Sequence, residues 1–416
     1  MKTIEVKKPS GYATQIGPAH PALKEPVMFS LDIEGERIRK ADFVPGMAHR
    51  GVEWMGMRRN CIQTMYLAER ICGICGITHS ISFSRAVEQI AQIQVPNRAH
   101  YIRSIVGELE RIHSHLLWAG VAAHELGFDS AFYLAWRVRE NVMDLLEYLT
   151  GNRVHYAIIQ IGGVRRDIVP DQFPRIEESM KFFEGAYAKL AAVFLDDTTV
   201  QMRCRDCGVL TTDEARELCP VGPTARASGI KKDVRVDHPY AAYGDVEIEY
   251  QTPDLLTGEV RGDVYDRIVT RLLEVKQSIG IVRQLLAMLP DGPLLAIPKP
   301  AVLLAKLKGV AGEAVGRHEA PRGEVMHYVR LEAGKDEPAA WKVKASSYSN
   351  YMAWIPMMEG EQIADIPIIA ASIDPCISCT DRVALVRPDV RQIVTKEELH
   401  RLSVEKTRRI QAGLAK

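Results

Sequence analysis

Cys72-Gly73-Ile74-Cys75 and Cys376-Ile377-Ser378-Cys379 are two CxxC stretches near opposite ends of the chain, and they decide how the rest is interpreted. A thiolate is a soft ligand that favours zinc, copper(I) or iron–sulfur chemistry. Two thiolates in one turn can bind one metal together, so two such turns predict a site with four cysteine ligands. From the spacing alone, the plainest interpretation is a closed structural zinc site.

The residues around each pair argue against structural zinc. The cysteine pairs of structural zinc sites tend to be close in sequence, whereas most of the chain separates these two. His79, four residues after the first pair, can donate a hydrogen bond to a thiolate. Together, Glu69–His79 and Asp374–Arg382 resemble the two signature motifs of the large subunit of nickel–iron hydrogenases.

This resemblance implies a nickel–iron centre held by four thiolates, with cyanide and carbon monoxide on the iron. It implies that Cys72 and Cys376 bind nickel terminally, while Cys75 and Cys379 bridge nickel and iron. The reaction implied is the reversible reduction of two protons by two electrons to H2.

Three further side chains take roles that the resemblance implies. Glu25 lies at the start of the first predicted hairpin, where the family has a glutamate that passes protons, although a loop glutamate is otherwise most often solvated. Arg322 is implied as a fixed cation that donates hydrogen bonds to a cyanide. Ser347 would offer a hydroxyl to the other cyanide. The family usually has Pro-Ser where this chain has Ser346-Ser347.

A second metal site is implied by His49-Arg50-Gly51-Val52-Glu53, which is similar to the next family motif. In many relatives this glutamate binds magnesium or iron away from the active site, so Glu53 is the candidate ligand. By itself, Glu53 would be interpreted as a salt-bridged carboxylate at a helix start.

Bulk properties exclude several classes of function. The 416 residues contain 53 Lys and Arg and 53 Asp and Glu, so no net charge favours binding to nucleic acid or to a membrane surface. The first residues lack the apolar core of a signal peptide, and no run of 18 apolar residues predicts a membrane span. Eight cysteines without a secretion signal indicate metal binding rather than disulfides.

Apolar residues at helical spacing predict long helices over 98–126, 134–149, 176–194 and 268–286, and shorter helices between 56 and 95. Four amphipathic helices that each bury one stripe pack most simply as a bundle. The expected fold class is α+β, mainly α. The expected regions of one large-subunit domain are an N-terminal β region (1–55), a helical bundle (56–295), C-terminal strands (296–382) and a tail (383–416).

Alternating residues predict a hairpin over 27–45 and strands over 325–331 and 341–345. The apolar run Ile366–Ile373 is expected to be a strand that leads into Asp374-Pro375-Cys376. The turns between the long helices are similar to segments shared by membrane-linked hydrogenases and the quinone-site subunit of respiratory complex I, which extends the resemblance over nearly the whole chain.

A third cysteine group has two open interpretations. Cys204, Cys207 and Cys219 could form an extra zinc or iron site, but without a clear fourth ligand free thiols are favoured. Cys61 is expected to be a small buried apolar residue. His113 and His115 fall on or beside the apolar face of one helix, where a satisfied core histidine is the commoner case, and neither is assigned a role.

The ending Cys379-Thr380-Asp381-Arg382, with arginine where uptake hydrogenases generally have histidine, resembles the membrane-bound, hydrogen-evolving, energy-converting group. The implied partners are a small subunit with an iron–sulfur cluster, complex I-like membrane subunits that pump ions, and indirectly ferredoxin. The implied location is the cytoplasmic face of the membrane, peripheral through these partners. The alternative is a non-catalytic connecting or quinone-site subunit with a structural four-cysteine site.

The tail after Arg382 also has two interpretations. In this family a maturation endopeptidase often removes the tail, which implies cleavage between Arg382 and Val383 and a site that closes after metal loading. The charged helical pattern from Thr395 onward is equally compatible with an ordinary C-terminal helix that docks on the surface.

Overall fold

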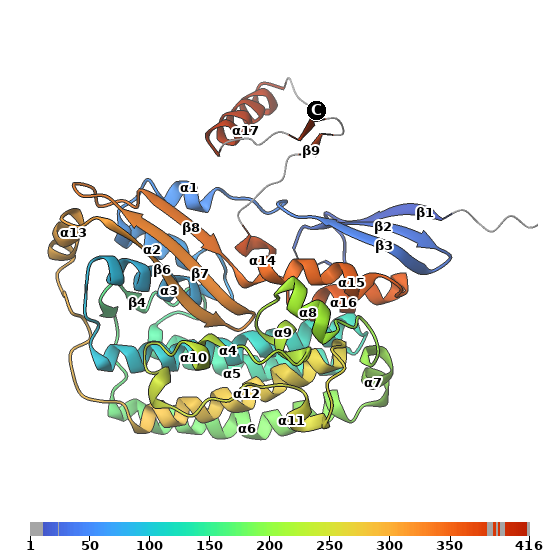
Figure 1. Cartoon of the computed structure of the whole chain (residues 1–416). Coiled ribbons are helices and arrows are strands. Elements are labelled where there is room, and N and C mark those ends of the chain that lie inside the picture. The colour runs from blue at the N-terminus through green and yellow to red at the C-terminus, as the bar shows by residue number, and fades with distance from the viewer. Residues whose placement is uncertain (1–10, 24, 381–385, 388–389, 392–395, 414–416) are drawn as a thin grey trace, which may run out of the picture.

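The computed structural model describes residues 11–23, 25–380, 386–387, 390–391 and 396–413. Figure 1 shows long helices stacked at the bottom, a sheet with two helices behind it at the upper left, and a second sheet at the upper right. This arrangement confirms the expected α+β class dominated by helices.

The four long helices are α4 (Asn97–Glu125), α5 (Asp129–Thr150), α6 (Phe173–Leu195) and α12 (Val264–Ala287). They pack against one another as predicted, with α4 contacting α5 and α12, and α6 contacting α5 and α12. Gly151 ends α5 with a φ of 90°, a left-handed conformation that favours glycine. The apolar stripes form the core between them, including Ile105, Leu109, Val142, Leu146, Phe183, Leu190, Val269 and Val282.

The N-terminal sheet has the antiparallel order β1 (Tyr12–Ile16), β2 (Met28–Glu34) and β3 (Arg37–Val44). The predicted hairpin is therefore confirmed, and β1 extends it by one strand. Alternate residues of β2 face the core, with Phe29, Leu31 and Ile33 buried. Phe29 packs edge-on against Trp354, whose helix follows the C-terminal sheet.

The C-terminal sheet is antiparallel, in the order β6 (Gly312–Ala320), β7 (Gly323–Leu331) and β8 (Ala340–Lys344). The helix α3 (Gly76–Ile90) contacts β6 and β7. Gly316 of β6 is required by this contact, because a Cβ atom built there would lie 1.9 Å from the carbonyl oxygen of Ser82 in α3. The four signature cysteines belong to the hydrophobic cluster between this sheet and α3.

The prediction of a strand over Ile366–Ile373 is wrong, because this segment is the helix α16 (Ile366–Ser372). A short apolar run without polar alternation does not distinguish a buried strand from a buried helix. Pro367 lies in the first turn of α16, where the missing N–H is not needed. The carbonyl oxygens at its C-terminal end accept hydrogen bonds from Trp354 Nε1, Trp118 Nε1 and Arg271 Nη2.

Most of the other elements are short connections between these parts, and α17 is a longer helix near the C-terminal end. The α-helices are α1 (Val52–Gly56), α2 (Cys61–Glu69), α7 (Thr198–Cys204), α8 (Thr212–Leu218), α9 (Pro223–Ala227), α10 (Val234–Asp237), α11 (Asp254–Thr257), α13 (Pro300–Lys308), α14 (Ser346–Asn350), α15 (Trp354–Met358) and α17 (Lys396–Gln411). The 3-10 helices are η1 (Pro170–Gln172), η2 (Tyr243–Asp245), η3 (Tyr351–Ala353), η4 (Ile363–Asp365) and η5 (Ile377–Cys379). The two-residue strands are β4 (Ile159–Gln160), β5 (Gly163–Val164), β9 (Val386–Arg387) and β10 (Val390–Arg391).

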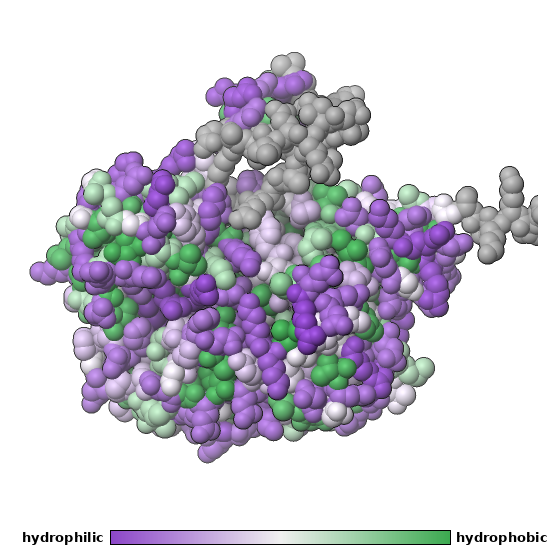
Figure 2. Space-filling view, viewed as in Figure 1, coloured by the Kyte–Doolittle hydropathy of each residue, from purple (hydrophilic) through white to green (hydrophobic). Residues whose placement is uncertain are grey.

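The surface of the bundle is mostly hydrophilic on the face shown in Figure 2, with small apolar areas scattered between polar side chains. Among the described residues, no helix combines the length and the apolar character needed to cross a bilayer.

We predict that Gly316→Ala destabilises the protein by about 1–3 kcal/mol, because the new methyl group overlaps the backbone of α3. Gly280→Ala in α12 is the matched control, since a Cβ atom there meets nothing within 4 Å outside its own helix turn. The control should be neutral or up to about 1 kcal/mol more stable, because alanine favours helices. Denaturant unfolding of both variants measures this, and equal effects would contradict the close contact.

Candidate metal centre

Two turns bring the four signature cysteines together. Cys72 and Cys75 lie in the loop between α2 and α3, and Cys376 and Cys379 lie in the turn that follows α16. The first turn is compact, because the backbone N–H groups of Ile74 and Cys75 both donate to the Cys72 sulfur at 3.3 Å. The sequence prediction of one four-cysteine group is confirmed.

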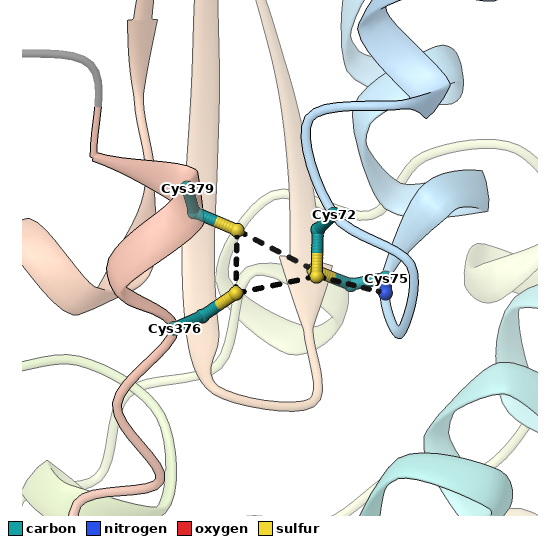
Figure 3. A group of neighbouring side chains, drawn as sticks. All are labelled: Cys72, Cys75, Cys376 and Cys379. Carbon is teal, nitrogen blue, oxygen red and sulfur yellow. Dashed lines mark hydrogen bonds between the residues drawn. The ribbon is translucent and has the colours of Figure 1, made fainter. Parts of the chain in front are cut away.

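The four sulfur atoms form one cluster, shown in Figure 3. The Sγ atoms of Cys376 and Cys379 are 2.8 Å apart, those of Cys72 and Cys376 are 3.2 Å apart, and those of Cys75 and Cys379 are 3.9 Å apart. All four side chains are at most 3% exposed. Sulfur ligands bind metals such as zinc at about 2.3 Å, so sulfurs this close can share a metal.

The environment favours the thiolate at Cys72 and Cys376, whose pKa values are lowered, and the thiol at Cys75 and Cys379, whose pKa values are raised. Hydrogen bonding with Cys376, helped by the charge of Arg322, lowers the pKa of the Cys72 thiol well below its usual value. Metals bind the thiolate rather than the thiol. The donor set therefore fits a soft metal ion, and soft thiolates suit nickel, zinc and iron alike.

A cavity of about 210 Å³ opens on one side of the cysteines. Its lining includes Cys72 and Cys376 but neither Cys75 nor Cys379. Glu25 and Arg322 line the same cavity. The two cysteines that the resemblance assigns to nickel alone are thus the pair that faces open space, next to a carboxylate and a guanidinium.

Glu25 contacts the second cysteine turn directly. Its Oε2 atom accepts hydrogen bonds from the backbone N–H groups of Ile377 and Ser378, the latter at 3.1 Å. Burial, and to a lesser extent the negative charge of Cys376, raise the pKa of the Glu25 carboxyl. A carboxyl group with a raised pKa can exchange protons nearer to neutral pH.

Arg322 is held from three directions. Its Nε atom donates to the carbonyl oxygen of Asp374 at 2.8 Å, and Nη2 donates to Asp374 Oδ1 at 2.8 Å. Its Nη1 atom donates to Ser114 Oγ of α4 at 3.1 Å. The guanidinium is therefore rigid beside the sulfurs, and the same contacts hold Asp374, whose φ is 54° and which begins the second cysteine turn.

The loop that carries Arg322 is itself fixed by α4. Arg111 donates to the carbonyl oxygens of Glu319 and Ala320 at 2.6 and 3.1 Å, at the end of β6. Arg111 is fully buried and pairs with Glu108 and Glu274, which lie in α4 and α12. A buried charge costs several kcal/mol without such partners, so the ion pairs allow this arginine to sit behind the site.

Arg50 connects the two cysteine turns, and the sequence analysis did not assign it a role. Its Nη2 atom lies 2.6 Å from both the carbonyl oxygen of Ile71, just before Cys72, and that of Ser378, between the second pair. The resemblance covered this motif, but only tertiary contacts identify Arg50 as the link between the turns.

Two predicted neighbours of the sulfurs are in place. The Nε2 atom of His79 lies 3.5 Å from the Cys379 sulfur. Ser347 of α14 accepts a hydrogen bond from the backbone N–H of Cys376 at 2.9 Å. Because a hydroxyl can donate while it accepts, the Ser347 proton stays available, and its donation to a cyanide remains a prediction.

Two families match different parts of the chain. The family described as "Nickel-dependent hydrogenase" matches residues 50–119, and "Respiratory-chain NADH dehydrogenase, 49 Kd subunit" matches residues 125–382. The membrane-bound hydrogenase subunit alpha of Pyrococcus furiosus is 48% identical over 396 residues, which cover 95% of this chain and 93% of that protein.

This chain belongs to the family of nickel–iron hydrogenase large subunits and complex I 49-kDa subunits. The carbon monoxide-induced hydrogenase of Rhodospirillum rubrum is 38% identical, over 90% of this chain and all of that protein. A chain in the structure of an archaeal membrane-bound sulfane sulfur reductase is 30% identical, with a TM-score of 0.82 over 90% of this chain and 99% of that chain.

In this family member, Glu53 already has protein partners. Its Oε2 atom accepts from Lys342 Nζ at 2.8 Å, and Oε1 accepts from the backbone N–H of Val343 at 3.0 Å. These contacts match the alternative that Glu53 is a salt-bridged carboxylate. A role of Glu53 as ligand of a second metal stays a prediction.

The third cysteine group does not assemble into one site. Cys204 and Cys207 are buried, whereas Cys219 is exposed. The Cys207 sulfur lies within 4.8 Å of carboxylate oxygens of Glu361 and Asp365, but Glu361 accepts from the N–H of Gly208 and Asp365 pairs with Arg203. The contacts favour free thiols. Cys61 is fully buried, as expected.

The other predicted features lie away from the sulfurs or outside the described residues. His113 Nε2 accepts from Arg139 at 2.6 Å, and His115 Nε2 lies 2.8 Å from Glu274, whereas the buried Nδ1 atom of each ring has no hydrogen-bond partner among the described residues, so the expectation of satisfied core histidines holds for one nitrogen of each ring. The predicted cleavage site, Arg382 and Val383, falls outside the described residues. Beyond it, α17 contacts the body through His400, which stacks on Trp54 with ring centroids 4.5 Å apart.

Glu110 of α4 positions the first cysteine turn. Its carboxylate accepts hydrogen bonds from the N–H groups of Ile77 and Thr78 at 2.7 and 3.1 Å and from the Thr78 hydroxyl at 2.7 Å, at the N-terminus of α3. Burial raises the pKa of Glu110 to about 8.

We predict that Glu110→Gln changes how stability depends on pH. Because the pKa of the carboxyl is higher in the folded than in the unfolded state, its contribution to stability is complete below about pH 4.5 and falls as the pH rises toward 8. Wild type should therefore lose about 1.4 kcal/mol per pH unit relative to the glutamine variant between pH 5 and 7. Denaturant midpoints at several pH values measure this, and a pH-independent difference would contradict it. Glu178→Gln, at an exposed position of α6, is the control.

Proposed function

We propose that this chain is the catalytic subunit of a nickel–iron hydrogenase that evolves H2 within a complex I-like membrane assembly. The observation that carries the proposal is the cluster of four buried cysteine sulfurs beside a cavity that Glu25 and Arg322 also line. A structural metal site has no need of an adjacent cavity with a titratable carboxyl group, whereas proton reduction needs one.

Cys72, Cys75, Cys376 and Cys379 would hold the nickel–iron centre with its cyanide and carbon monoxide ligands. When bound, the centre supplies the redox chemistry of 2 H⁺ + 2 e⁻ ⇌ H2. The side chains of this chain position and supply the proton. Arg322 is a fixed donor at the cavity wall, and the Ser347 hydroxyl lies at the second cysteine turn.

Glu25 is the proton carrier in this proposal. Its Oε2 atom is held by two backbone N–H groups, and its position in the cavity lining places the carboxyl beside Cys376. A carboxyl whose pKa is raised by burial can release and regain a proton without a large energetic cost.

Electrons must come from a partner. The sequence has no iron–sulfur motif such as Cx2Cx2C, so we propose a small subunit with a cluster, with ferredoxin as the ultimate donor. The names of the relatives, a membrane-bound hydrogenase and a membrane respiratory complex, support attachment to membrane subunits. We place the chain at the cytoplasmic face of the membrane.

A non-catalytic connecting subunit is the second candidate. The match of residues 125–382 to the 49-kDa subunit of a respiratory dehydrogenase favours it. The two candidates differ in their metal content, because only the catalytic subunit requires nickel.

We predict that this chain, matured with its maturation enzymes and then separated from its partner subunits, contains nickel and iron in about equal amounts and shows infrared bands of bound diatomic ligands. Mutation of a residue that only hydrogen-bonds to a metal ligand typically lowers metal affinity by roughly 10–100-fold. Cys379→Ala removes a ligand itself, so it should lower the nickel content by more than this. Cys219→Ala, at an exposed cysteine, should retain full nickel. Zinc in place of nickel in the wild-type protein would refute the catalytic proposal.

We predict that Glu25→Gln retains nickel but lowers hydrogen evolution by about 10²-fold or more, because glutamine has the same shape and cannot carry the proton. The matched control is Glu34→Gln, at an exposed position of the same N-terminal region. Metal analysis and H2 production are measured on the same samples. Full activity of the Glu25 variant would show that protons reach the site by another residue.

A further inference from the structure

A continuous line of buried polar groups leads away from Cys379 into the C-terminal sheet. His79 Nε2 lies 3.5 Å from the Cys379 sulfur, and His79 Nδ1 lies 3.0 Å from His327 Nε2. The line ends at Trp341, whose Nε1 lies 3.2 Å from His327 Nδ1. Both histidines and the tryptophan are fully buried.

The chemistry of the last group fixes the direction of every hydrogen bond in the line. An indole N–H can only donate, so His327 Nδ1 must accept and carries no proton. The neutral His327 ring therefore has its proton on Nε2 and donates to His79 Nδ1. His79 in turn has its proton on Nε2, which faces the Cys379 sulfur.

The surrounding fold holds this line in place. His327 in β7 is paired with Val343, and Trp341 is two residues away on β8, so both side chains lie on the same face of the sheet. Phe83 of α3 packs edge-on against Trp341, with ring centroids 5.6 Å apart. A Cβ atom on Gly56 would lie 2.3 Å from the Trp341 ring, so α1 closes the other side.

We propose that Trp341 and His327 are positioning residues that lock His79 in the Nε2–H tautomer, so that His79 always donates to Cys379 and never accepts from it. The tautomer follows from contacts within this chain alone. The effect of this tautomer on the metal centre rests on the proposed function, in which the Cys379 sulfur that accepts the hydrogen bond is a metal-bound thiolate. A permanent donor withdraws electron density from that thiolate and tunes the centre.

The test uses the nitrogen-15 NMR signals of the histidine rings in the full chain, which distinguish a protonated from a bare ring nitrogen. His79→Gln assigns the His79 signals among the 12 histidines. Wild type should show His79 with its proton on Nε2. A proton on Nδ1 of His79 in the wild-type protein would overturn the proposal.

Two substitutions at His327 separate positioning from packing. His327→Gln keeps the pattern, because the amide oxygen can accept from Trp341 while the amide nitrogen donates to His79, so the wild-type tautomer should be retained. His327→Leu fills the space without a donor, so His79 should lose its single tautomer. If the leucine variant keeps the wild-type tautomer, or the glutamine variant loses it, the proposal fails.

Trp341→Phe removes the indole N–H together with part of the ring and should give a mixture of tautomers at His327. Trp136→Phe is the control, since the buried Nε1 of Trp136 has no hydrogen-bond partner among the described residues.

A second readout is the infrared spectrum of the nickel-loaded complex. The bands of the bound diatomic ligands should shift in His327→Leu and stay in place in His327→Gln. Absence of nickel would refute the proposed function but leave the tautomer measurement intact, so the two failures are distinguishable.

Discussion

The guanidinium of Arg50 is the interaction on which the geometry of the centre depends, because it donates to the backbone of both cysteine turns. The two turns come from opposite ends of the chain. A guanidinium suits this task, because each Nη atom carries two N–H groups and Nη2 of Arg50 donates one to each turn. Arg50 thus ties the first turn directly to the second, while Glu110 holds the first turn and Glu25 the second.

A second layer of arginines repeats this principle further from the sulfurs. Arg322 holds Asp374 at the start of the second turn, and Arg111 holds the strand end that leads to Arg322. The charge of Arg322 is compensated by Asp374, and that of Arg111 by the buried carboxylates of Glu108 and Glu274. The helical bundle therefore supports the centre through ion pairs as well as through apolar packing, and a loss of one partner would leave a buried charge uncompensated.

Sequence reasoning located the elements whose patterns are local and missed those that depend on packing. The long helices were predictable because each repeats apolar residues at helical spacing over many turns. The helix α16 was not, because its seven residues, five of them buried, show no periodicity that separates it from a strand. The cysteines and His79 were found from the motifs. Arg50, His327 and Trp341 were not, because their partners are set by tertiary contacts between distant segments.

The distance in sequence between Cys75 and Cys376 has a consequence for how the protein is made. Closing a loop of about 300 residues costs about 5 kcal/mol in chain entropy beyond a constant. The bundle helices α4, α5, α6 and α12 all lie within this loop, so folding of the bundle brings the ends together and removes most of that cost before the sulfurs meet. During synthesis, the second cysteine pair leaves the ribosome long after the bundle. A metal bound by all four thiolates is therefore the last part of the structure to be completed, and it is bound only by a chain whose core has already folded.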